Sequence, residues 1–229
     1  QKFIICDVFF EAPAPANPCY GDTVSPDARL AKALASLPNI IIPYHYDDTK
    51  KNMERPIFKS PTALANYLTV DGQFFKYEYI SYDSAKSLPL RMYEYLHQKE
   101  VTTAYGFNWT GEKPILNNII LDFPIRNYDL FNAKDHYKTD NLENILSGFM
   151  SEADILNYCK DRIVVIGDFE VADKHETVYG SMGGTLILVN AYLALVNGNA
   201  FLNWKFLCFI MIAYFLTSYY LFWQASFKQ

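Results

Sequence analysis

Short, nearly continuous apolar runs recur along the first two thirds of this chain, at residues 3–10, 39–43, 115–123 and 162–167. Runs of this length that are rich in β-branched residues are typical of strands covered on both faces, as in parallel sheets between helices. Segments with helical signals lie between these runs. The pattern therefore predicts an α/β fold with a mostly parallel sheet flanked by helices.

Helix-start signals place some of these helices. Ser25 precedes Pro26, which is the order expected for an N-cap followed by proline at the first helical position. Ser60 and Pro61 repeat this order and predict a second helix that includes Leu64. A further helix is expected at 185–197. In residues 72–82 apolar and polar side chains alternate more regularly than in the apolar runs above, and this pattern predicts an antiparallel or edge strand.

The C-terminal apolar segment differs from all the others in its length. Residues 206–222 carry no charge, and Trp204 and Trp223 bracket them. A helix of about 20 residues rises about 30 Å, which is the thickness of the hydrocarbon core of a bilayer. Tryptophans at both ends match the lipid–water interface, and Lys205 can reach the headgroups. The sequence thus predicts a body at 1–200 and a transmembrane helix at 201–225, anchored in lipid by Trp204, Lys205 and Trp223.

The net charge, the cysteine spacing and the first residues of the chain limit which partners and which domain boundaries can be expected. The net charge is −5, and no basic cluster extends beyond Lys50 and Lys51, so nucleic acid is not expected as a partner. The absence of a Cys-x-x-Cys pair gives no reason to expect a metal, and no cofactor is predicted. Because residue 1 is Gln and leads directly into a strand, we expect the N-terminal part of the domain to be missing.

Acidic residues follow each predicted strand, where ligands bind in open parallel sheets. They are Asp7 and Glu11, then Asp47 and Asp48 beside His45, then Asp122, and last Asp168. Carboxylates that converge there can hold Mg²⁺ or Ca²⁺, as in a metal-dependent hydrolase. Strand-end aspartates also bond local backbone amides, and this structural role is the favoured interpretation.

Several segments together resemble the second-type CHASE domain, the cyclase/histidine-kinase-associated sensing extracellular domain. The start, Phe3-Ile-Ile-Cys-Asp-Val-Phe-Phe-Glu11 with Gly21-Asp22, is similar to its first strand and loop. Asp161-Arg-Ile-Val-Val-Ile-Gly-Asp168, Asp173-Lys-His-Glu-Thr-Val-Tyr-Gly180 and Gly184-Thr-Leu-Ile-Leu-Val-Asn190 resemble its later strand, loop and helix. Val178 stands where the family usually has proline, and Leu188 where it usually has histidine.

The resemblance implies a noncatalytic sensory domain on the periplasmic side of a bacterial inner membrane. Such a domain would report through helix 185–197 into the transmembrane helix, with an unknown small molecule as ligand and a protein partner or a second copy beside it. The candidate ligand-binding residues are Asp7, Glu11, Asp22, Asp168, Asp173, His175 and Thr177. Two alternatives remain open: a structural or accessory subunit of an envelope complex, and a metal-dependent hydrolase that uses Asp7, Asp122 and Asp168.

Overall fold

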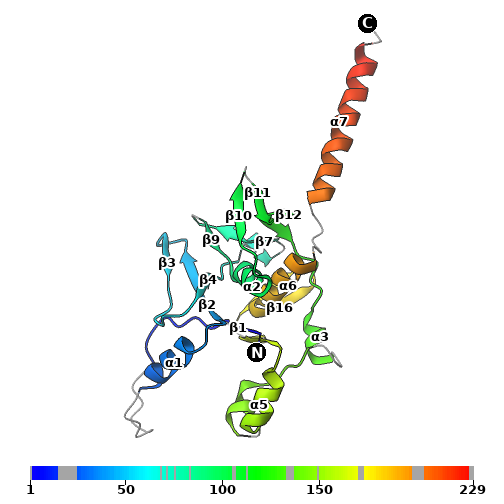
Figure 1. The fold of residues 1–229 in the computed structure, drawn as a ribbon. Coiled ribbons are helices and arrows are strands. Elements are labelled where there is room, and N and C mark those ends of the chain that lie inside the picture. The colour runs from blue at the N-terminus through cyan, green and yellow to red at the C-terminus, as the bar shows by residue number, and fades with distance from the viewer. Residues whose placement is uncertain are drawn as a thin grey trace.

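The body of the molecule is built around one sheet that joins distant parts of the chain (Figure 1). The computed structural model describes the whole chain except residues 1, 15–24, 68, 71, 75, 83, 105–106, 112, 133–136, 149, 170–172, 198–203 and 227–229. In the central sheet β1 (Phe3–Cys6) lies between β14 (Ile163–Ile166) and β2 (Ile40–Asp47), parallel to both. Ile5 is paired with Val165 on one side and Ile41 on the other, and it is fully buried. The prediction that these apolar runs form parallel strands is confirmed.

At the edge of this sheet, the helix predicted after Ser60 and Pro61 is replaced by a strand. β4 (Thr62–Leu64) runs parallel to β2, and β3 (Asn52–Glu54) runs antiparallel to it. Residues 62–64 were expected to be helical after Ser60 and Pro61. They are a strand because β2 offers free hydrogen-bonding groups: Ile42 N donates to Pro61 O at 3.0 Å, and Ala65 N donates to Tyr44 O at 3.0 Å. Pairing with a buried strand overrides a local start signal.

The expectation of a mostly parallel sheet is wrong for the rest of the body, where most sheets are antiparallel or mixed. The segment 115–123, expected as a buried parallel strand, supplies β13 (Asn118–Ile120), which pairs antiparallel with β7 (Lys76–Glu78). The other antiparallel pairs are β8 (Ile80–Ser81) with β9 (Ala85–Lys86), and β10 (Val101–Ala104), β11 (Phe107–Thr110) and β12 (Lys113–Ile115) in one sheet.

A four-stranded sheet of mixed direction shows why antiparallel pairs are common in this part of the body. Its order is β16 (Gly180–Gly183), β15 (Lys174–Thr177), β6 (Gln73–Phe74) and β5 (Thr69–Val70). Gly72, with φ of 76°, turns the chain from β5 into β6, a conformation that glycine adopts without strain. Such tight turns can join antiparallel neighbours only, because a parallel connection needs a crossover of a dozen or more residues.

Helices cover the sheets, and one of them begins at its predicted cap. Ser25 accepts a hydrogen bond from Ala28 N at the start of α1 (Pro26–Ala35), as expected. The others are α2 (Leu88–His97), α3 (Asn127–Asn132), α4 (Leu142–Leu146), α5 (Glu152–Cys159), α6 (Gly184–Asn197) and α7 (Trp204–Ser226). The predicted helix at 185–197 is therefore present as α6.

Helix α6 lies in the main core and packs against α2 (Figure 1). Leu186, Ile187 and Leu188 are almost completely buried, which is why this helix is apolar on nearly every side. One polar residue among them is Asn190, which is fully buried and bonds both backbone groups of Ile125. These bonds fix α6 against the segment that follows β13.

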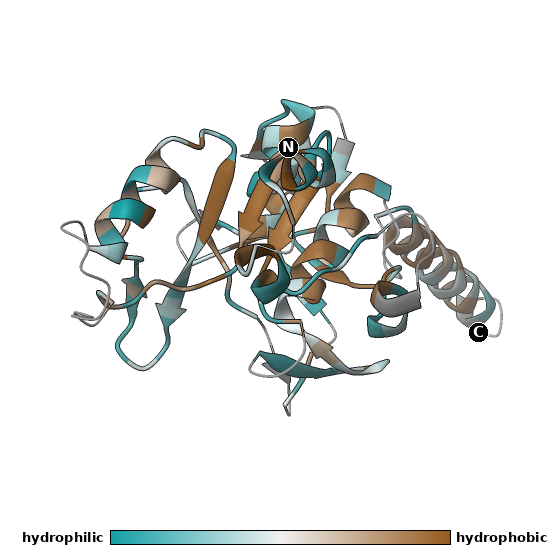
Figure 2. Cartoon of the chain, turned by 90° about the horizontal axis from the view of Figure 1, so that it is seen from below, coloured by the Kyte–Doolittle hydropathy of each residue, from teal (hydrophilic) through white to brown (hydrophobic). Residues whose placement is uncertain are grey.

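Helix α7 is the candidate membrane span. Residues Trp204–Gln224 are long and apolar enough to cross a bilayer, and none of its apolar window is buried within the described chain. Met211 and Phe222 are 71% and 77% exposed, and Figures 1 and 2 show the helix standing apart from the body with apolar residues along it. The predicted C-terminal apolar helix is confirmed; the anchoring roles of Trp204, Lys205 and Trp223 remain predictions.

Candidate functional site

Asp7 stands at the carboxyl end of β1, where the central sheet meets the start of α6. Its backbone N–H donates to Ile166 O at 2.7 Å and so continues the pairing of β1 with β14. Its carboxylate Oδ2 accepts a hydrogen bond from Thr185 Oγ1 at 2.7 Å. Thr185 is the second residue of α6 and is fully buried. A strand-end carboxylate is thus bonded to the helix that precedes α7.

Two glycines leave the space that this contact needs. A Cβ atom at Gly167 would collide with the side chain of Thr185. A Cβ atom at Gly184 would collide with the carboxylate of Asp173 and lie 2.8 Å from the hydroxyl of Tyr67. Gly167 and Gly184 are therefore spacers around the start of α6.

Asp173 and His175 extend the site from the segment that leads into β15. Asp173 Oδ1 lies 2.9 Å from His175 Nε2, and Asp173 O accepts a hydrogen bond from Gly184 N at 2.7 Å. The ring of Tyr67, which follows β4, lies over the imidazole with 4.5 Å between centroids. The buried Tyr67 hydroxyl has no hydrogen-bond partner among the described residues. We call Asp7, Tyr67, Asp173, His175 and Thr185 the Asp7 cluster.

Burial dominates the electrostatics of the Asp7 cluster. It raises the pKa of Asp7 from 3.8 to about 6. The hydrogen bond from Thr185 and the positive charge of His175 lower this pKa, while the negative charge of Asp173 raises it further. Burial, with the charges of Asp7 and Asp173, also raises the pKa of Tyr67 well above 10. The cluster therefore contains a carboxyl group that changes charge between mildly acidic and neutral pH.

The remaining predicted ligand residues lie elsewhere or act locally. Glu11 is exposed on the segment after β1. Thr177 Oγ1 donates to Gly180 O at 2.7 Å and accepts from Tyr179 N at 3.1 Å, so its hydroxyl closes the turn between β15 and β16. Asp168 lies two residues after the end of β14, and its carbonyl oxygen lies close to Gly183. Asp22 falls outside the described residues. The structure thus brings together Asp7, Asp173 and His175 from the predicted set.

The acidic residues invoked for a hydrolase do not form one cluster. In the parts of the chain that the structure describes, no group of three or more His, Cys, Asp or Glu side chains is placed to hold a metal ion. Burial raises the pKa of Asp122, which follows β13 in a different sheet from Asp7. Asp47 accepts hydrogen bonds from Thr49 N and Lys50 N, which is the local role favoured for strand-end aspartates.

Sequence reasoning missed Tyr67, Thr185 and a cavity of about 650 Å³ between the β2–β4 edge and α2. Thr185 was not identified because it lies in the first turn of an apolar helix, where a threonine gives no sign of a binding role. The cavity is lined by residues from separate elements, and we call it the tyrosine–arginine cavity: Tyr44, Tyr46, Lys51, Asn52, Met53, Arg55, Thr62, Tyr82, Ser84, Ala85, Lys86 and Arg91.

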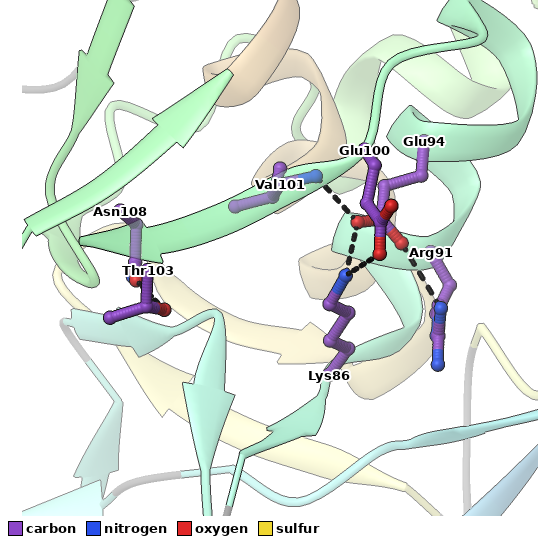
Figure 3. Close-up of polar contacts among 7 residues, drawn as sticks. All are labelled: Lys86, Arg91, Glu94, Glu100, Val101, Thr103 and Asn108. Atoms are coloured by element: carbon purple, nitrogen blue, oxygen red, sulfur yellow. Dashed lines mark hydrogen bonds and ion pairs between the residues drawn. The ribbon is translucent and has the colours of Figure 1, made fainter. Parts of the chain in front are cut away.

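A partly buried glutamate on α2, Glu94, holds two of the cavity's cations in place (Figure 3). Glu94 Oε1 lies 2.6 Å from Lys86 Nζ and accepts a hydrogen bond from Val101 N at 2.8 Å. Its Oε2 lies 3.2 Å from Arg91 Nη1, and Lys86 also lies 3.6 Å from Glu100. With the Glu94 side chain only 11% exposed, this network fastens α2 to β9 and β10.

The fold and these sites define a mixed α/β domain followed by a helix that can span a membrane. The family model of the CHASE2 domain matches residues 1–219, so the chain belongs to the CHASE2 domain family and the predicted resemblance is confirmed. CHASE2 domains are a sensory, extracellular family, which suggests a nonenzymatic membrane protein. Neither the curated proteins nor the solved structures compared with the chain gave a significant match.

Proposed function

We propose that this chain is a membrane-anchored sensor domain on the periplasmic side of a bacterial inner membrane. It binds a small molecule and passes the binding event through α6 to α7. The observation that carries this proposal is the position of α6: its first turn is bonded to Asp7 in the central sheet, and its last residue, Asn197, precedes Trp204 by only a few positions.

The contacts of α6 support a mechanical role. Tyr79 Oη donates to Ala191 O at 3.0 Å, and Tyr192 Oη lies 3.5 Å from His97 Nε2 on α2. The helix is therefore held by the sheet at its start and by α2 near its end. Packed helices respond to ligands with shifts of about 1–2 Å because tight cores move between discrete arrangements. A shift of α2 or β1 would then reach α7 through α6.

The expected membrane topology can be tested by cysteine labelling of intact cells. Leu156→Cys places a thiol on α5, where the native side chain is 63% exposed, and Gln229→Cys places one beyond α7. A membrane-impermeant maleimide is expected to add label to the first variant but not to the second, relative to the parent chain. The opposite pattern would place the body in the cytoplasm and remove the proposal.

Membrane attachment of residues 1–229 is expected to depend on α7. The intact chain should remain in the membrane pellet after an alkaline carbonate wash, because α7 presents an apolar surface along its whole length. A chain that ends at Asn203 should move to the supernatant. Sedimentation followed by immunoblotting checks both, and an intact chain found in the supernatant contradicts a membrane span.

Signal transfer through α6 can be measured as the position of α7 relative to the body. Spin labels at Val178→Cys on the β15–β16 turn and Phe215→Cys on α7 report this distance in lipid nanodiscs, once the native cysteines are replaced. Thr185→Val removes the hydrogen bond to Asp7 and is expected to shift the distance distribution. Glu152→Gln, on an exposed residue of α5 outside the candidate ligand-binding set, is the control and should leave it unchanged. Identical distributions for all three chains would refute signal transfer through this contact.

A further inference from the structure

The tyrosine–arginine cavity has the charge of an anion-binding site. The described residues that line it include Lys51, Arg55, Lys86 and Arg91 but no carboxylate. Three of these cations have acidic partners outside the lining: Lys51 lies 3.9 Å from Asp48, and Lys86 and Arg91 share Glu94. Arg55 differs from them, because no carboxylate of the described chain lies within ion-pair distance of it.

Arg55 is held in the cavity by an aromatic ring. Its guanidinium carbon lies 5.0 Å from the centroid of the Tyr44 ring, a cation–π distance that leaves the N–H donors at the guanidinium edge free for a ligand. Tyr44 belongs to β2 and is 8% exposed, so the ring is a fixed platform. Burial raises the pKa of Tyr44, and the charges of Arg55 and Arg91 both lower it. Both guanidinium groups therefore lie near the same tyrosine.

A flat aromatic surface completes the wall of the cavity. The rings of Tyr46 and Tyr82 stack with 4.0 Å between centroids and 21° between planes. Asn52 and Thr62 add an amide and a hydroxyl. Planar guanidinium groups match the two oxygens of a carboxylate, and tyrosine faces favour a planar apolar group beside it. The volume of about 650 Å³ falls in the range of about 300–1,000 Å³ that is typical of small-molecule sites.

We propose that the tyrosine–arginine cavity binds a small organic anion, a carboxylate carried on a planar group, with Arg55 and Arg91 holding the carboxylate against Tyr44. This proposal rests on the sensory function proposed above and assigns the chemical class of its ligand. Arg91 lies on α2, and α2 packs against α6. A ligand that draws Arg91 toward Arg55 therefore acts on the helix that supports α6.

Binding is tested with the full chain in nanodiscs, with benzoate as the probe and isothermal titration as the measurement. Benzamide has the same ring without the charge, and inorganic phosphate has the charge without the ring. Benzoate is expected to bind, and each of the other two to bind at least about tenfold more weakly, because each lacks one of the two recognised features. Phosphate that binds as tightly as benzoate would overturn the organic part of the assignment.

Matched variants connect the binding to the cavity. Arg55→Gln is expected to weaken benzoate binding by about tenfold or more, because it removes charge-assisted hydrogen bonds. Arg55→Lys keeps the charge but loses the planar fork, and an intermediate loss is expected. Lys50→Gln is the control, since this lysine is 62% exposed, pairs with Asp47 and Glu54, and does not line the cavity. Benzoate binding that survives Arg55→Gln would overturn the site.

The experiments distinguish a failure of the proposed sensor function from a failure of the proposed ligand site. If benzoate fails to bind while Leu156→Cys is labelled from outside the cell, the ligand class is wrong and the sensor topology stands. If benzoate binds but the spin-label distances between the body and α7 do not change, the cavity stands and signal transfer through α6 is wrong.

Discussion

Replacement of Asn190 by leucine is expected to lower the free energy of unfolding by about 2–5 kcal/mol. Asn190 is fully buried in α6, donates to Ile125 O at 2.8 Å and to Leu186 O at 3.0 Å, and accepts from Ile125 N at 2.9 Å. Leucine fills nearly the same volume but leaves the N–H and C=O groups of Ile125 buried without partners. Each unsatisfied buried group costs about 1–3 kcal/mol. Chemical denaturation of the full chain in detergent, followed by circular dichroism, measures the loss.

The control for this variant is Asn197→Ala at the exposed end of the same helix, which should change the unfolding free energy by less than about 0.5 kcal/mol. A loss at Asn190 no greater than at Asn197 would mean that water or a shifted backbone replaces the side chain. In that case α6 is not held against the segment after β13 in the way described.

The buried amide was partly predictable from sequence, and so was the sheet around it. An asparagine within an apolar helix must either satisfy its hydrogen bonds internally or face a partner, and Asn190 does the first. The runs at 3–10, 39–43 and 162–167 contain β1, β2 and β14 because strands buried on both faces need continuous apolar residues. The run at 115–123 looked the same but pairs with β7, because the aromatic side chains of Tyr77 and Tyr79 provide another buried surface.

The residues of the candidate sites were harder to predict from the sequence than the strands were. Asp7 was identified because it follows a strand, where ligands bind in open sheets, whereas Asp173 and His175 were identified because residues 173–180 resemble a CHASE-domain loop. Thr185 and Tyr67 were not, since neither lies at a strand end and only the folded chain brings them to Asp7. The tyrosine–arginine cavity takes residues from β2, β4, β9 and α2, and no local pattern in any of these segments marks it.

Replacement of Asp7 by asparagine is expected to stabilise the protein at pH 8 by about 3 kcal/mol. The folded chain raises the pKa of Asp7 from 3.8 to about 6, so the folded state binds the proton more tightly than the unfolded state. The resulting stabilisation is fully present below about pH 4 and is lost as the pH rises through about 6. Each unit of pKa difference corresponds to about 1.4 kcal/mol, which gives the figure above. Asparagine keeps an oxygen that can accept the bond from Thr185 and carries no charge.

The pH dependence separates this effect from a change in packing. The difference in unfolding free energy between Asp7→Asn and the native chain should be near its maximum at pH 8, and should fall steadily between pH 6 and 4.5. The charges of Asp173 and His175, which act on Asp7, are present in both chains and largely cancel in the difference. Glu11→Gln makes the same chemical change at an exposed site and should show no such trend.

A difference in unfolding free energy that stays constant across this pH range would show that burial does not raise the pKa of Asp7 in the folded chain. If the trend appears, the native chain retains a charged carboxylate at the start of α6 although a neutral amide is more stable there. Residues that lower stability in this way are found where function requires a particular charge. The contact between the central sheet and the start of α6 would then carry a negative charge that lowers the stability of the folded chain.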